Sequence, residues 1–245
     1  MPEGPSIVLL REAAARFKGK TVRTVQGNSK LDLSVLEGRR VRAVRSWGKH
    51  FLLEFSRLSV RIHLMMFGSW RIDERKPSPP RLSLGFDTGE LNFYACSVKL
   101  IEVPLEEVYD WRGDVMSDAW DPALARRKLK AIPEALVCDA LLDQTIFAGV
   151  GNIIKNEVLF RIRVHPSSRV GDLPPRKLGD LIKQARLYSF EFLEWKRAFE
   201  LKKHWQVHTK RTCPNCGGPL TKAYLGLTAR RSFFCRNCQV DYSDG

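Results

Sequence analysis

Two pairs of cysteines near the end of the chain have the spacing of a metal site. Cys213 and Cys216 form one Cys-x-x-Cys pair, Cys235 and Cys238 form another, and 18 residues separate the pairs. Four thiolates with this spacing are typical of structural zinc, which has no coordination position open for catalysis. Two disulfides are the alternative, but we expect an intracellular chain because no secretion signal is visible. We therefore expect one structural Zn²⁺ ion held by these four residues.

The start of the chain could supply a nucleophile. Met1 precedes the small residue Pro2, so we expect its removal, which would leave the imino group of Pro2 as the free terminus. An α-amine titrates about 2.5 pH units below lysine. It can therefore attack a sugar C1′ carbon or form an imine. The neighbouring Glu3 is a natural acid for proton transfer. Taken alone, the same residues would be an ordinary exposed terminus.

The charge of the chain predicts a polyanionic partner. Lys and Arg number 41 against 27 Asp and Glu, a formal net charge of +14. Such an excess favours nucleic acid over a merely soluble basic protein. The cations are spread out, which favours a groove over a basic tail. Arg230 and Arg231 lie on an expected β hairpin between the cysteine pairs and suit phosphate, although a solvated basic turn would look the same.

Hydrophobic periodicity divides the chain into a β-rich first part and a helical second part. A helix over 6–17 precedes an antiparallel β sandwich or barrel, and helices follow after about residue 113. We expect an α+β fold with domains at 1–112, 113–206 and 207–245. The last is too small for its own apolar core. Cys96 and Cys138 are predicted to be buried thiols. The expected strands are 40–44, 50–55, 59–64, 82–86 and 91–94, and the expected helices of the second part are 122–130, 133–142, 153–160 and 175–197.

The most apolar stretch of the chain does not qualify as a membrane span. Asp139, Asp143 and Gln144 interrupt it, whereas a span requires about 20 predominantly apolar residues. We therefore expect a soluble, cytoplasmic protein without a membrane partner.

Five separated motifs resemble the formamidopyrimidine-DNA glycosylase and endonuclease VIII family, in order along essentially the whole chain. This resemblance implies base-excision repair with an N-terminal β sandwich, a helical domain containing a helix-two-turn-helix, and a zinc finger. It implies a bifunctional DNA glycosylase and AP lyase acting on double-stranded DNA with oxidised bases or abasic sites. We expect a monomer, nucleoid-associated if bacterial. The motifs are Pro2-Glu3-Gly4-Pro5, Gly48-Lys49, His63 to Gly68, Gly149-Val150-Gly151-Asn152, and the cysteine pairs.

The resemblance implies that Pro2, Glu3, Lys49 and Arg230 are the catalytic residues. Pro2 would displace the damaged base and form an iminium with the deoxyribose. Glu3 would protonate the sugar and assist cleavage of the strand by β/δ-elimination. Lys49 would contact phosphate near the lesion and support catalysis, whereas a bland interpretation makes it a solvent-facing lysine at a turn.

The resemblance also implies contacts to DNA. Asn152, at the start of a helix, would bind phosphate with backbone amides; otherwise it would be a simple N-cap. Arg230 would grip the phosphates flanking the lesion, with Arg231 as the reserve candidate. Met65, Met66 and Phe67 would fill the gap left by a flipped nucleotide, whereas three such apolar residues would usually belong to a core.

The branch of the family follows from what two segments lack. Residues 94–100 do not carry the Arg-Arg-Phe-Gly setting of formamidopyrimidine-type members and look like endonuclease VIII. Residues 195–205 leave little room for the loop that caps oxidised purines, so we expect oxidised pyrimidines. Ser6 departs from the glutamate that is common in the family, so the resemblance leaves open the rate and the choice of substrate but not the nucleophile.

Three alternatives to an oxidised-pyrimidine enzyme remain. The first is the same chemistry on oxidised purines, namely formamidopyrimidines and 8-oxoguanine. The second is a non-catalytic zinc protein that binds damaged DNA and does not need Pro2. The third, an RNA-associated zinc ribbon, explains the charge and the cysteines but leaves Pro2, Lys49 and Asn152 without a function.

Overall fold

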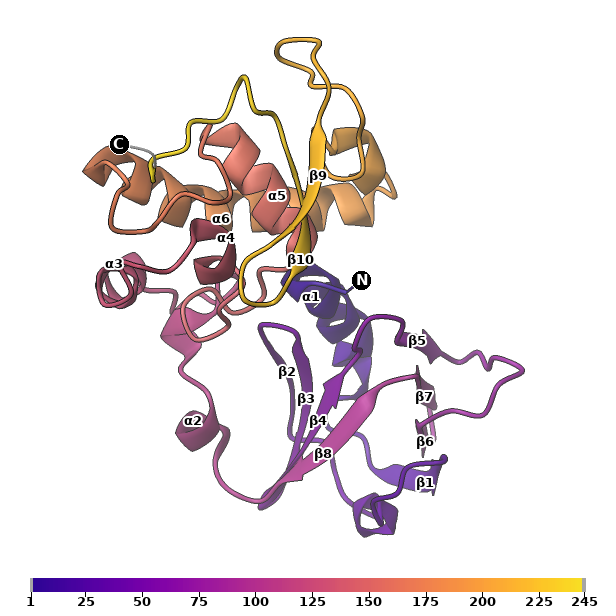
Figure 1. Ribbon diagram of the computed structural model, residues 1–245. Helices are drawn as coiled ribbons and strands as arrows, with labels where there is room; N and C mark the ends of the chain where they lie inside the picture. Colours follow the sequence, from indigo (N-terminus) through magenta and orange to yellow (C-terminus); the bar gives the residue numbers. More distant parts are fainter. Residues whose placement is uncertain (1, 244–245) are drawn as a thin grey trace. The chain divides into compact units, whose positions relative to one another are not determined.

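The computed structural model describes residues 2–243 and divides into two units, 1–110 and 111–245 (Figure 1). Antiparallel sheets dominate the first unit, and helices with one β hairpin make up the second, which confirms the expected α+β class. Within the described residues, no helix has both the length and the apolar character needed to cross a membrane.

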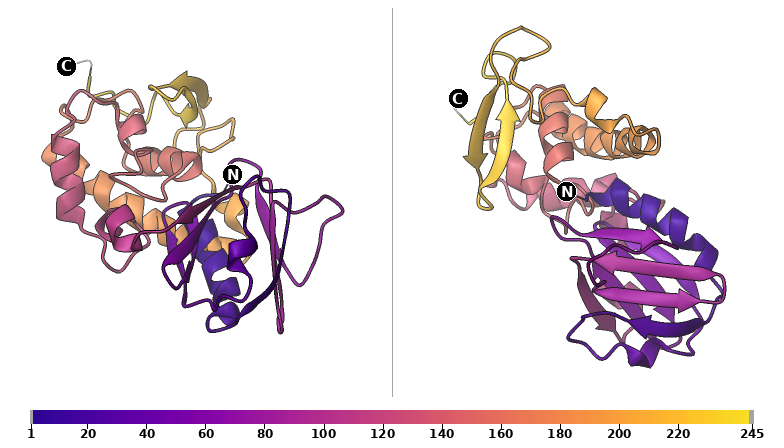
Figure 2. Two further views of the ribbon diagram at one scale, coloured as in Figure 1. Left: turned by 90° about the horizontal axis from the view of Figure 1, so that it is seen from below. Right: turned by 90° about the vertical axis from the view of Figure 1, so that its right-hand side faces the viewer.

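The first unit is a sandwich of two four-stranded antiparallel sheets, one of which faces the viewer in the right-hand view of Figure 2. Phe51 and Phe93 face each other between the sheets, with ring centroids 5.6 Å apart. Consecutive residues of these two strands are buried, including Leu52 next to Phe51 and Asn92 next to Phe93. One sheet has the order β1 (Val22–Gln26), β6 (Leu82–Phe86), β7 (Gly89–Tyr94), β5 (Ser69–Ile72); the other has β2 (Ala43–Trp47), β3 (His50–Phe55), β4 (Leu58–His63), β8 (Ser97–Ile101).

Helix α1 (Gly4–Ala14) precedes the sandwich and packs against β2 and β3. It carries Ile7, Leu10 and Ala14 into the core at helical spacing, and a 3₁₀ turn extends it to Phe17. A short helix α2 (Leu105–Val108) ends this unit.

Several expected elements differ by one or two residues from the structure, and two differ by more. The strand expected at 40–44 is β2, shifted to Ala43–Trp47, because its pairing runs from Ala43 opposite Glu54 to Trp47 opposite His50. The helix expected at 133–142 is only α4 (Val137–Ala140). The residues before Val137 are not helical because Leu136 forms a β-bridge to Arg169.

The second unit is built on three longer helices, α3 (Pro122–Lys130), α5 (Asn152–Arg161) and α6 (Pro175–Arg197). The Asp121 side chain caps α3 by accepting hydrogen bonds from the N–H groups of Ala123 and Leu124 at 2.8 and 3.1 Å, and Pro122 fits the first helical position. Helix α5 packs on α6 and on the hairpin of β9 (Thr221–Leu225) and β10 (Arg230–Phe234). The expected separation of 207–245 as its own domain stays a prediction.

Candidate functional site

The start of α1 places Pro2 and Glu3 in contrasting environments. Pro2 is half-buried, whereas Glu3 is fully buried. Glu3 is the N-cap of α1, and its carbonyl oxygen accepts hydrogen bonds from Ser6 N at 2.8 Å and Ile7 N at 3.3 Å. The Glu3 side chain makes no N-cap hydrogen bond to α1. The expected removal of Met1 concerns a residue outside the described range.

Lys49 lies in the two-residue turn between β2 and β3. Trp47 pairs with His50 across this turn. Gly48 supplies a φ of +52°, a conformation that two-residue hairpin turns favour and glycine tolerates. The lysine is half-buried rather than simply solvent-facing. In Figure 1 the start of α1 and this turn lie at the same end of the first unit.

Two histidines next to this turn are kept neutral. His50 and His63 are directly opposite each other on β3 and β4, with ring centroids 5.4 Å apart. Burial, followed by the charge of Arg61, lowers the pKa of His50 to about 3. Burial and then the charge of Lys49 lower the pKa of His63. Positive charge at this end of the sheet therefore resides on Lys49 and Arg61 at neutral pH.

The residues expected to fill a gap in DNA form an exposed loop, which we call the wedge loop (65–67). Phe67 is 85% exposed, and Met65 and Met66 are 53% and 48% exposed, so the core alternative is wrong. The loop begins directly after His63 and Leu64, so the strand register places it at the same sheet end as Lys49.

Backbone contacts hold the wedge loop in shape. Gly68 N donates a 2.7 Å hydrogen bond to Leu64 O, and a Cβ at Gly68 would lie 2.1 Å from that oxygen. Met65 adopts a φ of +52°, and its N–H donates to His63 Nδ1 at 3.3 Å. The lowered pKa of His63 keeps Nδ1 available as an acceptor. His63 is therefore a contributor to loop geometry that the sequence did not single out.

Asn152 links the start of α5 to the finger hairpin. Gly151 is the N-cap of α5, so the simple N-cap interpretation of Asn152 is wrong. Its Nδ2 donates a 2.9 Å hydrogen bond to the carbonyl oxygen of Arg231. Its Oδ1 is buried without a hydrogen-bond partner within the described chain. The positive N-terminal end of the ten-residue helix α5 and the Asn152 amide thus lie beside β10, which carries two arginines.

Buried polar residues of α5 that sequence reasoning missed continue this link. Lys155 Nζ donates to Ser232 Oγ at 2.8 Å and to Arg231 O at 3.3 Å. The Glu157 carboxylate accepts three backbone N–H bonds at 2.8–3.0 Å from the segment 206–208. Because buried polar groups must be paired, these residues fasten the cysteine-bearing segment to the helix. The sequence of α5 did contain a signal for these contacts, because polar residues are flanked by apolar ones on every face of the helix.

The finger hairpin presents Arg230 and Arg231 at the start of β10, and both are exposed. Gly226 and Leu227 lie in the loop between the two strands. The Asp139 carboxylate accepts the N–H of Leu227 at 3.0 Å, and a Cβ at Gly226 would lie 2.2 Å from the same carboxylate. Helix α4 therefore positions the loop that precedes the two arginines.

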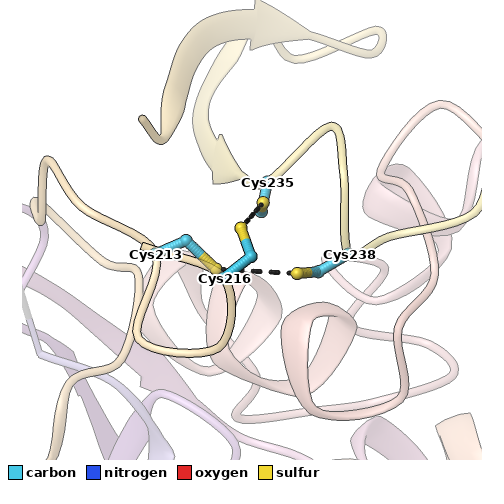
Figure 3. Close-up of side chains that lie close together, drawn as sticks. All are labelled: Cys213, Cys216, Cys235 and Cys238. Carbon is cyan, nitrogen blue, oxygen red and sulfur yellow. Dashed lines mark hydrogen bonds between the residues drawn. The ribbon is translucent and has the colours of Figure 1, made fainter. Parts of the chain in front are cut away.

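The four cysteines of the two pairs come together as the spacing predicts. Figure 3 shows their sulfur atoms turned toward one another, and all lie within 4.8 Å. The Cys213 and Cys238 sulfurs are 3.8 Å apart, and those of Cys216 and Cys235 are 3.5 Å apart. A tetrahedral thiolate site with bonds of about 2.3 Å needs edges of about 3.8 Å. The geometry fits a metal ion, and the sulfurs are too far apart for disulfides.

The two remaining cysteines do not belong to a metal site. Cys96 and Cys138 are buried and free, as predicted. Burial raises the pKa of both thiols to about 11, which keeps them protonated and unreactive.

Comparison with known proteins gives consistent matches along the chain. Residues 1–96 match the model of the formamidopyrimidine-DNA glycosylase N-terminal domain, and residues 114–187 match that of the formamidopyrimidine-DNA glycosylase H2TH domain. The DNA-(apurinic or apyrimidinic site) lyase Nei2 of Mycolicibacterium smegmatis is 32% identical over 183 residues, covering 71% of each chain.

A longer animal protein and a solved structure are also similar. Endonuclease 8-like 3 of Xenopus laevis is 30% identical over 90% of this chain but only 38% of its own length. The chain thus spans about two fifths of that relative. A crystal structure of Lactococcus lactis formamido-pyrimidine DNA glycosylase bound to AP-site DNA superposes with a TM-score of 0.83. It shares 22% identity and covers 97% of this chain and 99% of that chain, which supports the fold.

Proposed function

Because this chain belongs to the formamidopyrimidine-DNA glycosylase and endonuclease VIII family, we propose that it is a bifunctional DNA glycosylase and AP lyase of base-excision repair. The observation that carries this proposal is Pro2 beside a fully buried Glu3. Lys49 and the wedge loop at the end of the β2–β3–β4 sheet support it.

The proposed reaction uses the imino nitrogen of Pro2 after removal of Met1. The nitrogen attacks C1′, the glycosidic bond breaks, and the base leaves with the bonding electrons and a proton. Glu3 protonates O4′ as the C1′–O4′ bond opens, which leaves an iminium between Pro2 and the sugar. Loss of a C2′ proton then expels the 3′ phosphate, and water releases the nitrogen. Lys49, Asn152 and the finger arginines hold the phosphates.

Oxidised pyrimidines are the proposed substrates. Only Ala95 and Cys96 connect β7 to β8, and the Cys96 side chain is buried. This connection leaves no room for the arginine and phenylalanine that a second loop supplies in the other branch. All residues that fill the gap would come from the wedge loop.

The metal of the four cysteines is proposed to be one zinc ion. Four sulfur ligands at tetrahedral separations suit Zn²⁺, which would fix the hairpin without taking part in catalysis. Metal analysis should find one zinc per chain. We also propose a monomer, because every residue that the reaction needs lies in one chain. Its proposed location is the cytoplasm, in association with the nucleoid if the protein is bacterial.

The test is cleavage of duplexes that each contain one oxidised pyrimidine, one 8-oxoguanine, one abasic site or no damage. We expect the purified protein to cleave the pyrimidine and abasic duplexes, and Pro2→Gly to lose at least about 100-fold in base removal. Faster cleavage at 8-oxoguanine would select the oxidised-purine alternative. Tight binding of the abasic duplex without any cleavage would select the non-catalytic damaged-DNA-binding alternative.

A further inference from the structure

A cavity of about 770 Å³ lies between α3 and α6 in the second unit. These two helices pack against each other, and both are labelled in Figure 1. Trp120, Ile182 and Leu187 give the cavity an apolar lining. The Trp120 ring leans on Phe147, with centroids 5.9 Å apart, so its position is fixed by the core of the unit. We call this cavity the α3–α6 groove.

Four cations surround this apolar lining. Arg126 and Arg127 come from α3, and Lys183 and Arg186 come from α6. No carboxylate of the described chain lines the groove. Of these cations, Arg127 forms an ion pair at 3.9 Å with Asp121, whose side chain also caps α3. The groove therefore combines an apolar floor with a rim that carries four cations and no lining carboxylate.

Specific contacts keep the groove open. Arg186 Nη1 donates hydrogen bonds to Val115 O at 2.9 Å and Ser117 O at 2.8 Å, so its guanidinium is held at the wall. Gly179 has no side chain, and this lets the Arg126 guanidinium lie close to α6, since a Cβ at Gly179 would lie 3.2 Å from Arg126 Nη2. Leu187 remains 43% exposed, which is an unfavourable state for a large apolar side chain in water.

We propose that the α3–α6 groove docks an acidic peptide segment of a partner protein through one bulky apolar side chain. The apolar side chain would fill the space over Ile182 and Leu187, and carboxylates on either side would pair with the four cations. Charge complementarity favours this occupant over a neutral one. A duplex DNA backbone matches the charges, but it has no bulky apolar side group that could insert over the floor. Asn152, Arg230 and Arg231 do not line this groove.

The test uses a fluorescein-labelled peptide with one central phenylalanine among alternating aspartates and serines, and the full-length protein. Fluorescence anisotropy should show saturable binding. We expect Arg126→Glu/Lys183→Glu to weaken it at least tenfold, while the charge-matched control Lys20→Glu/Lys30→Glu binds within twofold of wild type. Replacing the phenylalanine by serine, or the aspartates by asparagine, should each weaken binding at least tenfold.

A second variant tests the floor without changing charge. Ala123 lies at the groove on α3 and is exposed. Ala123→Trp should therefore fold normally and weaken peptide binding at least tenfold. Cleavage of an abasic duplex should be unchanged in the groove variants. The proposal is overturned if the peptide does not bind saturably, or if Ala123→Trp binds it as wild type does. It is also overturned if an oligothymidylate of equal charge binds the groove more tightly than the peptide.

Discussion

At the residue scale, the wedge loop keeps three large apolar side chains in water. A positive φ at Met65 and a glycine that no larger residue can replace give the loop one shape. Exposed apolar groups of this kind gain most when they enter the stack of a duplex from which a base has left. We therefore expect these side chains to contribute to base removal and little to folding.

Phe67→Ser is expected to lower base removal about tenfold or more, because refilling the vacated stack offsets an unstacking cost of a few kcal/mol. The stability change should stay within about 0.5 kcal/mol, since the side chain is exposed. Single-turnover cleavage and urea unfolding measure the two effects. Phe199→Ser, at a second exposed phenylalanine, is the matched control and should change neither base removal nor stability. Normal base removal by Phe67→Ser would remove the loop from the mechanism.

At the element scale, the ends of β3 and β4 bring two neutral imidazoles beside Lys49 and the wedge loop. His50 also has a buried Nδ1 without a hydrogen-bond partner in the described chain. Its pKa of about 3 in the folded protein lies below the unfolded value of about 6.5. Between these values the unfolded chain binds a proton that the folded chain does not, so stability falls as the pH drops below about 6.5.

His50→Phe should remove this part of the pH dependence and retain the ring packing. Between pH 7.5 and 5.5 the wild type should lose about 1.4 kcal/mol of unfolding free energy through this residue. His50→Phe should lack that loss in urea titrations at both pH values. His204→Phe, at an exposed histidine stacked on Trp195, should retain it. Equal pH dependence in His50→Phe and wild type would refute the burial argument.

Strong local signals made several elements predictable from the sequence. Proline at the start and a cation-rich end gave α3 and α6 at the predicted bounds, and the cysteine spacing gave the sulfur cluster. The helix expected at 133–142 was too long because the pairing of Leu136 with Arg169 is a long-range contact. The contacts of Asp139 and Glu157 could not be predicted because their partners lie 88 and about 50 residues away.

At the scale of the whole molecule, the candidate residues are divided between the two units. The first unit carries Pro2, Glu3, Lys49 and the wedge loop, and the second carries Asn152 and the finger arginines. A net charge of +14 favours a DNA complex built largely on phosphate neutralisation and counterion release.

Binding to an abasic duplex should therefore weaken steeply with salt. If Lys49, Arg230 and Arg231 each neutralise a phosphate, the slope of log K against log salt should be about −2.7 or steeper. Arg230→Ala should reduce the slope by about 0.9, whereas Arg176→Ala, at an exposed arginine of α6, should not change it. Affinity independent of salt would argue against a phosphate-tracking surface.

The most direct test of the central claim is to locate the covalent bond to DNA. Protein without Met1 is incubated with an abasic duplex and borohydride, digested with trypsin, and examined by mass spectrometry. The account predicts a reduced sugar adduct on the nitrogen of Pro2, within the peptide that ends at Arg11, and no adduct when Met1 is retained. An adduct on a lysine, equal trapping by protein that keeps Met1, or no adduct at all would contradict it.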